Sequence, residues 1–105
     1  MLKEFDFVNV PIVDIVNAIF IDASNKGASD IHYDPWEEFM KIRIRIDGEL
    51  IDYAKVPNAY KNNLVTRIKI LSGMNITESR LPQDGALKAT IGGEDVDMRV
   101  SCLPT

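Results

Sequence analysis

The sequence has 105 residues, of which 46% are hydrophobic and 27% are charged, and its formal net charge at pH 7 is −4. A chain of this length buries roughly two thirds of its unfolded surface, which is enough for one core, so we predict a single domain over residues 1–105. The acidic balance argues against a surface for nucleic acid or anionic membranes, and the apolar runs are too short to cross a bilayer.

The sequence has a single cysteine and a single histidine, which limits the kinds of site it can form. Cys102 has no partner for a disulfide within the chain and lies in an alternating apolar series, so we predict a core residue rather than a reactive thiol. A structural zinc site lacks its ligands. This cysteine usage fits a reducing, cytoplasmic setting.

The first predicted element is a helix over residues 11–26. Pro11 suits a first helical position, and apolar residues then recur with a period of 3.6. Gly27 follows the last turn as a C-terminal cap. Residues 1–8, which precede this helix, are rich in apolar side chains, and we expect a docking arm or a short strand there.

A short strand is predicted before Pro35, with Ile31 and Tyr33 on one face and Asp30 and His32 on the other. Because positions i and i+2 of a strand share a face, Asp30 and His32 can meet as a carboxylate–imidazole pair. We interpret this pair as a hydrogen bond that fixes the start of the strand, since no nucleophile motif or phosphate-binding loop supports catalysis.

Residues 40–56 give the strongest pattern in the chain and predict a hairpin of two strands. Isoleucines alternate with basic residues on the outgoing strand, so Arg43 and Arg45 share its polar face. Asp47-Gly48 is a two-residue turn of the kind that tolerates positive φ.

The second helix is predicted over about residues 58–72, with Gly73 as its cap. Its inward face is expected to carry Leu64, Val65, Ile68 and Leu71. The connector over residues 75–85 has no sustained period, and its turn-rich composition is better explained by an interface than by packing.

The last predicted element is a hairpin, in which residues 87–91 and 96–102 alternate around a Gly92-Gly93 turn and Arg99 lies on the polar face. The order is therefore α-β-β-β-α-β-β. Because hairpins dominate, the sheet should be mostly antiparallel with helices on one face, which is an α+β fold of PAS-like proportions.

The arginines are the best candidates for a binding function. If the strands that carry Arg43, Arg45 and Arg99 share a sheet, their guanidinium groups converge on an exposed face and match phosphate or carboxylate groups. The alternative is a solvated outer face on which Arg99 pairs with Asp95 or Asp97. From composition and spacing alone we favour this second interpretation.

Four blocks of the sequence resemble the secretion and pilus-assembly ATPases, the hexameric motors of bacterial type II secretion and type IV pilus extension. The blocks are GASDIHYDP at 27–35, RIRIDGEL at 43–50, RIKILSGMNITESRLPQDG at 67–85 and VDMRVSCLPT at 96–105. The resemblance covers about Pro11 to Thr105 and implies the PAS-like N-terminal half of the motor's catalytic module. It also implies that Thr105 leads into a RecA-like domain with the Walker A loop, so this chain alone is expected to be inactive.

The resemblance further implies roles for the arginines. In these motors, arginines of the PAS-like half contact the terminal phosphates of ATP, bound with Mg²⁺, when the two halves close. Arg99 and Arg80 match the arginine-bearing segments, but Ala86 stands where the family commonly has a further arginine, which leaves Arg99 as the principal candidate. The candidates for a subunit or domain interface are Arg43, Arg45, Arg67, Asp30 and His32.

The implied partners are the RecA-like domains of the same and the adjacent subunit in a homohexamer, and platform proteins of the inner membrane. The chain is then cytoplasmic and peripheral to that membrane, with no insertion and no nucleic-acid partner. Two other interpretations stay open, a free-standing PAS-like sensor of a small ligand and a protein–protein adaptor that binds through the edge of the last hairpin. Pilus extension, competence and type II secretion are not separated by the sequence.

Overall fold

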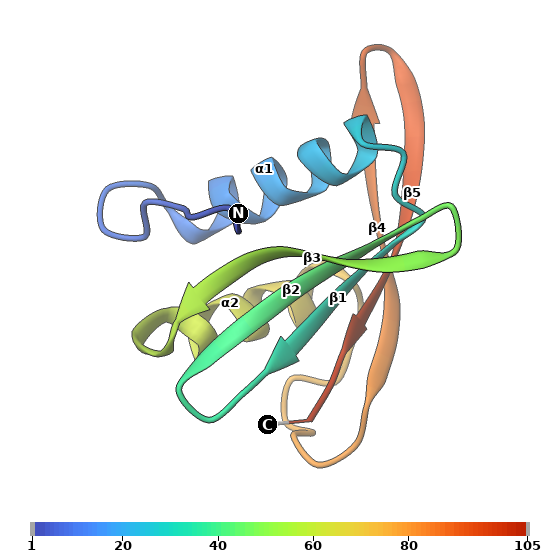
Figure 1. Cartoon of the computed structure of the whole chain (residues 1–105). Coiled ribbons are helices and arrows are strands. Elements are labelled where there is room, and N and C mark those ends of the chain that lie inside the picture. The colour runs from blue at the N-terminus through green and yellow to red at the C-terminus, as the bar shows by residue number, and fades with distance from the viewer. Residues whose placement is uncertain (1, 105) are drawn as a thin grey trace.

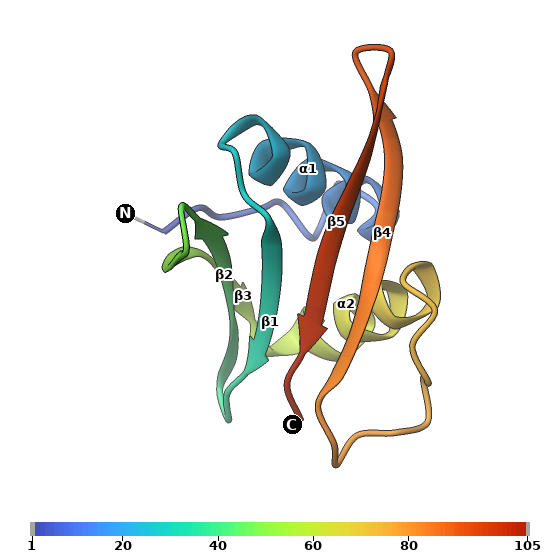
Figure 2. The same cartoon turned by 90° about the vertical axis from the view of Figure 1, so that its right-hand side faces the viewer.

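The computed structural model describes residues 2–104, and these residues contain two helices and one five-stranded sheet in the predicted order. The elements are α1 (Ile12–Asn25), β1 (Asp30–Pro35), β2 (Phe39–Ile46), β3 (Glu49–Pro57), α2 (Asn58–Leu71), β4 (Gln83–Ile91) and β5 (Glu94–Cys102). Both helices cover the same face of the sheet (Figures 1 and 2). The predicted α+β class is therefore confirmed.

The strand order is β3-β2-β1-β5-β4, so the first strand lies beside the last one at the centre of the sheet. Adjacent strands pair antiparallel except β1 and β5, which are parallel. The β4–β5 hairpin extends beyond the helices (Figure 2). This topology joins segments that are about seventy residues apart, with Asp30 opposite Arg99.

The ends of α1 differ slightly from the prediction. Pro11 precedes the helix as its N-cap, with ψ at 147°, and its carbonyl accepts the N–H groups of Asp14 and Ile15 at 3.0 and 3.1 Å. The fixed φ of proline suits the cap as well as the first turn. At the other end, Gly27 has a φ of +79° and its N–H donates to Ser24 O, which is the expected cap.

Helix α2 buries a stripe that is centred slightly differently from the predicted one. Leu64 and Ile68 are fully buried, but the prediction was wrong for Leu71, which is 43% exposed. The centre of the buried face runs through Leu64, Ile68 and Ser72, which are four residues apart. Leu71 therefore lies at the edge of this face. Ser72 brings its carbonyl against β4 at Gly85.

Strand β4 begins earlier than predicted and takes in Gln83–Gly85, the end of the predicted connector. These residues show no alternation of side chains, but their backbone pairs with the end of β5, where Gly85 lies opposite Val100. The close approach of α2 requires glycine there, because a Cβ at Gly85 would lie 2.4 Å from Ser72 O. Backbone pairing therefore extends the strand where the sequence pattern does not.

The segment before α1 contacts the free edge of β3 at Lys3 and then reaches α2. Lys3 pairs in parallel with Ala54, and its N–H donates to Tyr53 O at 2.9 Å. Phe7 stacks on Tyr60 of α2 with 5.0 Å between ring centroids. Met1, and Thr105 with its expected link to a further domain, lie outside the described residues.

The core fills the space between the helices and the covered face of the sheet. Among its fully buried members are Ile15, Ile19, Ile31, Tyr33, Ile42, Leu64 and Ile68. The core position predicted for Cys102 is confirmed, since this residue is 3% exposed and burial raises the pKa of its thiol to about 11. Neither helix between residues 2 and 104 is long and apolar enough to span a membrane.

Candidate functional site

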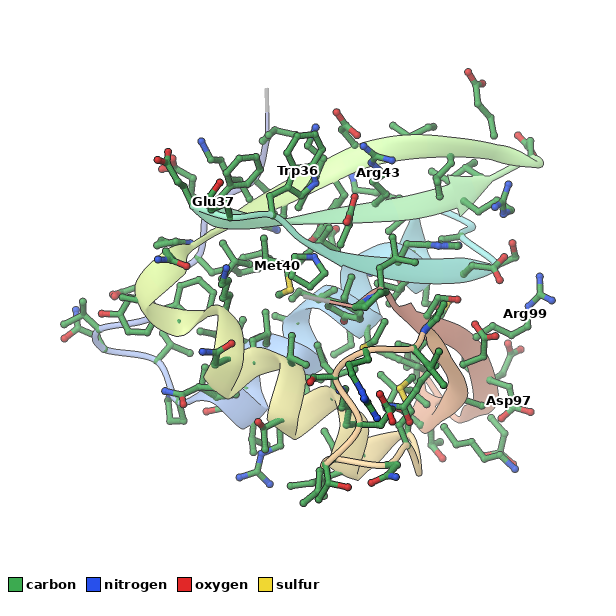
Figure 3. All side chains as sticks on the ribbon, turned by 90° about the horizontal axis from the view of Figure 1, so that it is seen from below. Trp36, Glu37, Met40, Arg43, Asp97 and Arg99 are labelled. Atoms are coloured by element: carbon green, nitrogen blue, oxygen red, sulfur yellow. The ribbon has the colours of Figure 1, made fainter. Side chains whose placement is uncertain are left out.

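The face of the sheet that the helices do not cover, called here the open face, carries most of the predicted site residues. Because β2 and β5 flank β1, the arginines of these two strands lie beside the polar residues of β1. Figure 3 shows Arg43 and Arg99 extending away from the helices, whereas Met40 points toward them. The predicted arrangement of arginines on one exposed face is therefore present.

Asp30 is the centre of the first row of this face. It lies opposite Arg45 of β2 and opposite Arg99 of β5. Arg99 Nε lies 2.8 Å from Asp30 Oδ1, and Arg99 Nη2 donates to Oδ2 at 3.1 Å, which makes a bidentate contact. Arg45 Nε lies 3.7 Å from Oδ2, and Ser29 Oγ donates to the same oxygen at 2.6 Å. One carboxylate thus serves two guanidinium groups.

Burial differs sharply between the members of this row. Asp30 is 6% exposed, whereas the side chain of Arg99 is 75% exposed. Burial raises the pKa of the Asp30 carboxyl, but the hydrogen bonds from Ser29 and Arg99 and the charges of Arg99 and Arg45 outweigh it, so the pKa falls below its usual value. Asp30 is therefore an ionised anchor beneath an exposed cation.

His32 is the centre of the second row, with Arg43 on one side and Ser101 on the other. Arg43 Nε lies 3.1 Å from Asp52 Oδ1, and Ser101 Oγ donates to Asp84 Oδ1 at 2.6 Å. Burial and the neighbouring positive charge of Arg45 lower the pKa of the His32 imidazole, so this ring is neutral at pH 7. The second row therefore contains one arginine paired with a carboxylate and one further carboxylate that accepts a serine hydroxyl.

Two predicted pairings were wrong. No hydrogen bond joins Asp30 to His32 among the described residues, and Arg99 pairs with Asp30 rather than with Asp95 or Asp97. Side chains two apart on a strand are separated by almost 7 Å, whereas directly opposite residues of neighbouring strands are closer. The parallel pairing of β1 with β5 has no local sequence signal, so the true partners were missed.

Ala86 occupies the end of the first row, directly opposite Arg99 in the β4–β5 pair. An arginine at this position, as the resemblance would favour, would stand beside Arg99 on the open face. With alanine there, the row consists of Arg45, Asp30 and Arg99 and has a formal charge of +1.

Arg80 does not lie in either row. It belongs to the connector between α2 and β4, its side chain is 89% exposed, and its Nε lies 3.9 Å from Glu78 Oε1. The connector is ordered by Gln83, whose amide accepts from Asn75 N at 2.7 Å, and by Lys69, whose Nζ donates to Glu78 O at 2.6 Å. The periodicity of the sequence did not predict this ordered conformation, because it is held by side-chain hydrogen bonds rather than by a repeating backbone structure.

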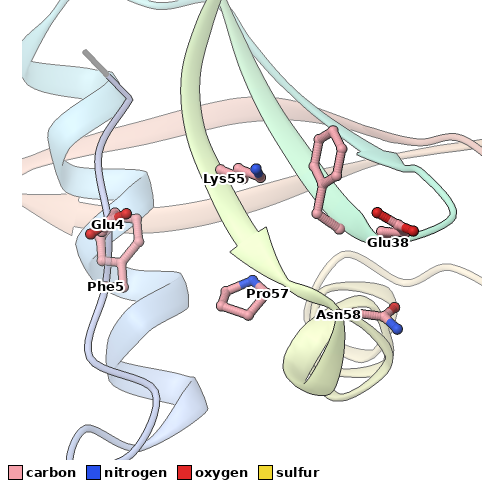
Figure 4. A pocket seen from close by; sticks show the side chains of 7 residues that line it. Glu4, Phe5, Glu38, Lys55, Pro57 and Asn58 are labelled. Atoms are coloured by element: carbon pink, nitrogen blue, oxygen red, sulfur yellow. The ribbon is translucent and has the colours of Figure 1, made fainter.

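Arg67 lies apart from the open face, on α2. It lines a shallow hollow of about 300 Å³ together with Ile12 and Ile70. A second hollow, of about 440 Å³, separates Glu4 and Phe5 of the N-terminal segment from the ends of β2 and β3 (Figure 4). No pattern in the sequence predicted this hollow. No three His, Cys, Asp or Glu side chains gather as a metal site in the part of the chain that the structure describes.

Comparison with known proteins places the chain in a family. The family described as type II/IV secretion system protein matches residues 8–105, so the chain belongs to this family. The predicted resemblance is thereby confirmed.

The relatives include proteins named for type IV pilus assembly and proteins named for type II secretion. The type IV pilus assembly ATPase PilB of Myxococcus xanthus is 43% identical over 98 residues, 92% of this chain and 17% of that protein. The type II secretion system protein E of Aeromonas hydrophila is 42% identical over 97 residues, 92% of this chain and 19% of that protein. The type II secretion system ATPase E of Vibrio cholerae is 39% identical, with the same coverage. The chain thus spans less than a fifth of the length of these relatives.

Proposed function

We propose that this chain is a regulatory, nucleotide-contacting domain of a hexameric ATPase that powers type IV pilus assembly or type II secretion. Family membership and the names of the relatives support the class of machine. The observation that carries the nucleotide contact is the Asp30–Arg99 pair, which anchors an exposed guanidinium group at the centre of the open face.

The open face suits a phosphate group. Asp30 occupies the Nε and Nη2 edge of Arg99, so the remaining N–H donors of this side chain face solvent. In the longer protein, ATP with Mg²⁺ supplies the terminal phosphate, and Arg99 stabilises its negative charge when the domains close. Arg80 supplies a second contact from the exposed connector, and the chain hydrolyses no ATP by itself.

The rest of the open face serves contacts between domains. In this proposal Arg43, Arg45, Asp30 and His32 face a RecA-like domain, of the same chain or of the adjacent subunit, and the PAS-like domain moves with the nucleotide state. Arg67 belongs to a separate contact on α2. The motor is cytoplasmic and reaches the inner membrane through platform proteins of the pilus or secretion machine.

The proposal is tested by Arg99→Ala in the full-length ATPase, with hydrolysis followed by phosphate release. We expect the rate to fall by about a hundredfold or more, as for the loss of an arginine that stabilises phosphoryl transfer. Lys88→Ala is the matched control, because Lys88 is an exposed cation on β4 opposite Asp97, outside both rows. Equal rates for wild type and Arg99→Ala, with the hexamer intact, would refute the contact.

A further inference from the structure

We propose that Asp30 sets the strength with which the open face binds phosphate, by acting as a built-in counter-ion to Arg99 and Arg45. This inference rests on the proposed role of Arg99 as a phosphate contact. It assigns to Asp30 a positioning and charge-balancing role: phosphate binds to Arg99 while Asp30 stays in place, and it therefore binds weakly and leaves readily.

The geometry separates the carboxylate from the incoming anion. Asp30 is 6% exposed and lies beneath a guanidinium group that is 75% exposed, so phosphate approaches Arg99 from the solvent side. The carboxylate holds Nε and Nη2 at 2.8 and 3.1 Å, which fixes the plane of the guanidinium and directs its free donors outward. Asp30 thus orients Arg99 without occupying the position of the anion.

The charges of the row determine the affinity. Arg45, Asp30 and Arg99 sum to +1, and Ala86 adds nothing at the end of the row. Without Asp30 the same groups would sum to +2 at almost the same positions. Coulomb energy falls with distance and is screened by salt. The carboxylate of Asp30 therefore weakens the attraction of Arg99 for phosphate more than a distant acidic residue does.

The counter-ion is fixed by the backbone and by its own hydrogen bonds. β1 pairs on both sides, with β2 and with β5, so the carboxylate cannot move away from the row. Ser29 Oγ also holds Oδ2 at 2.6 Å. The site therefore returns to the same arrangement, with a net charge of +1, whenever phosphate leaves, which suits a motor that binds and releases nucleotide in every cycle.

The test is a titration of the 105-residue chain with tripolyphosphate, followed through the Arg99 Nε–H resonance and by calorimetry. We expect Asp30→Asn to bind about five- to tenfold more tightly than wild type, the order expected for removal of one nearby charge. Asp97→Asn is the matched control: it removes the same charge from the same face and strand as Arg99 but breaks no ion pair with it (Figure 3). It should change the affinity by no more than about twofold.

The double variant Asp30→Asn/Arg99→Gln should not show the increased affinity of Asp30→Asn, because the positive charge that loses its counter-ion in Asp30→Asn is that of Arg99. Equal affinities for Asp30→Asn and Asp97→Asn, or no binding by Asp30→Asn, would overturn the inference. The proposed function fails in a different way, when Arg99→Gln alone leaves wild-type binding unchanged. Thermal unfolding of each variant checks folding, and Asp30→Ser, which removes the same charge and keeps a hydroxyl, replaces Asp30→Asn if that variant does not fold.

Discussion

Asp30 shows how a single buried carboxylate links stability to the candidate site. It accepts hydrogen bonds from Ser29 and Arg99, and its replacement by asparagine removes the charge from both contacts. We expect Asp30→Asn to lower the free energy of unfolding by about 1–3 kcal/mol, the range for hydrogen bonds to charged groups. Urea denaturation at pH 7 measures this change, and a variant as stable as wild type would show that the pair contributes nothing.

The same carboxylate gives a pH dependence with a defined sign. Its pKa in the folded protein lies below the ordinary value of 3.8, so ionised Asp30 favours the folded state. This stabilisation is fully present above the ordinary pKa and is lost as the pH falls through the folded pKa.

Wild type should therefore lose stability between about pH 5 and about pH 2 more steeply than Asp30→Asn. Asp6 and Asp22, whose pKa values are also lowered, contribute equally to both proteins, so the difference between the two curves isolates Asp30. Urea denaturation at several pH values across this range measures the free energy of unfolding of both proteins. The same pH dependence for wild type and Asp30→Asn would contradict the expectation.

Ala86 offers a second experiment at the scale of one residue. Arginine there would stand opposite Arg99 and raise the charge of the row from +1 to +2. We expect Ala86→Arg to bind tripolyphosphate about fivefold or more tightly, for the same electrostatic reason as Asp30→Asn. Ala89→Arg, on the opposite face of β4, is the control. An unchanged affinity would show that the end of the row lies outside the reach of the anion.

At the scale of elements, α2 and β4 depend on one glycine. A Cβ at Gly85 would lie 2.4 Å from the carbonyl oxygen of Ser72, which is backbone and cannot turn aside. We expect Gly85→Ala to cost about 1–3 kcal/mol, as overpacking does. Ala86→Ser, the exposed neighbour, should change stability by less than about 0.5 kcal/mol. If both variants denature at the same urea concentration, the contact between α2 and β4 is looser than described.

Element boundaries were predictable where local chemistry fixes them. Asp47-Gly48 and Gly92-Gly93 both have positive φ at both positions, as their hairpin turns require, and the alternating isoleucines of β2 all point inward. The prediction that Leu71 is buried was wrong because periodicity identifies an apolar stripe on the helix but does not say which residue lies at the centre of its buried face. The predicted start of β4 was too late because backbone pairing with β5, rather than a side-chain pattern, forms that end of the strand.

The candidate site was predictable only in part, for a related reason. Placing the arginines on one polar face needs only the period of two residues along each strand, and this prediction was confirmed. Their partners depend on which strands are neighbours. The parallel contact of β1 and β5 joins distant segments, so the Asp30–Arg99 pair could not be read from spacing.

At the scale of the whole molecule, Cys102 reports on the opening of the core. It is 3% exposed, and burial raises the pKa of its thiol to about 11, so little thiolate is present near pH 8. We expect an aromatic disulfide reagent to modify the folded chain at least about a hundredfold more slowly than the urea-unfolded chain. Comparable rates would mean that β5 opens without global unfolding.

The position of β5 beside β1 also constrains the order in which the fold can assemble. The hairpins β2–β3 and β4–β5 close short loops, whereas the seam between β1 and β5 closes a loop of 69 residues, between Asp30 and Arg99. On the ribosome, α1 and the first three strands emerge long before β5 and leave one edge of β1 unpaired. The arginine that completes the open face thus arrives with the last strand, and a nascent chain acquires this surface only at the final step of its folding.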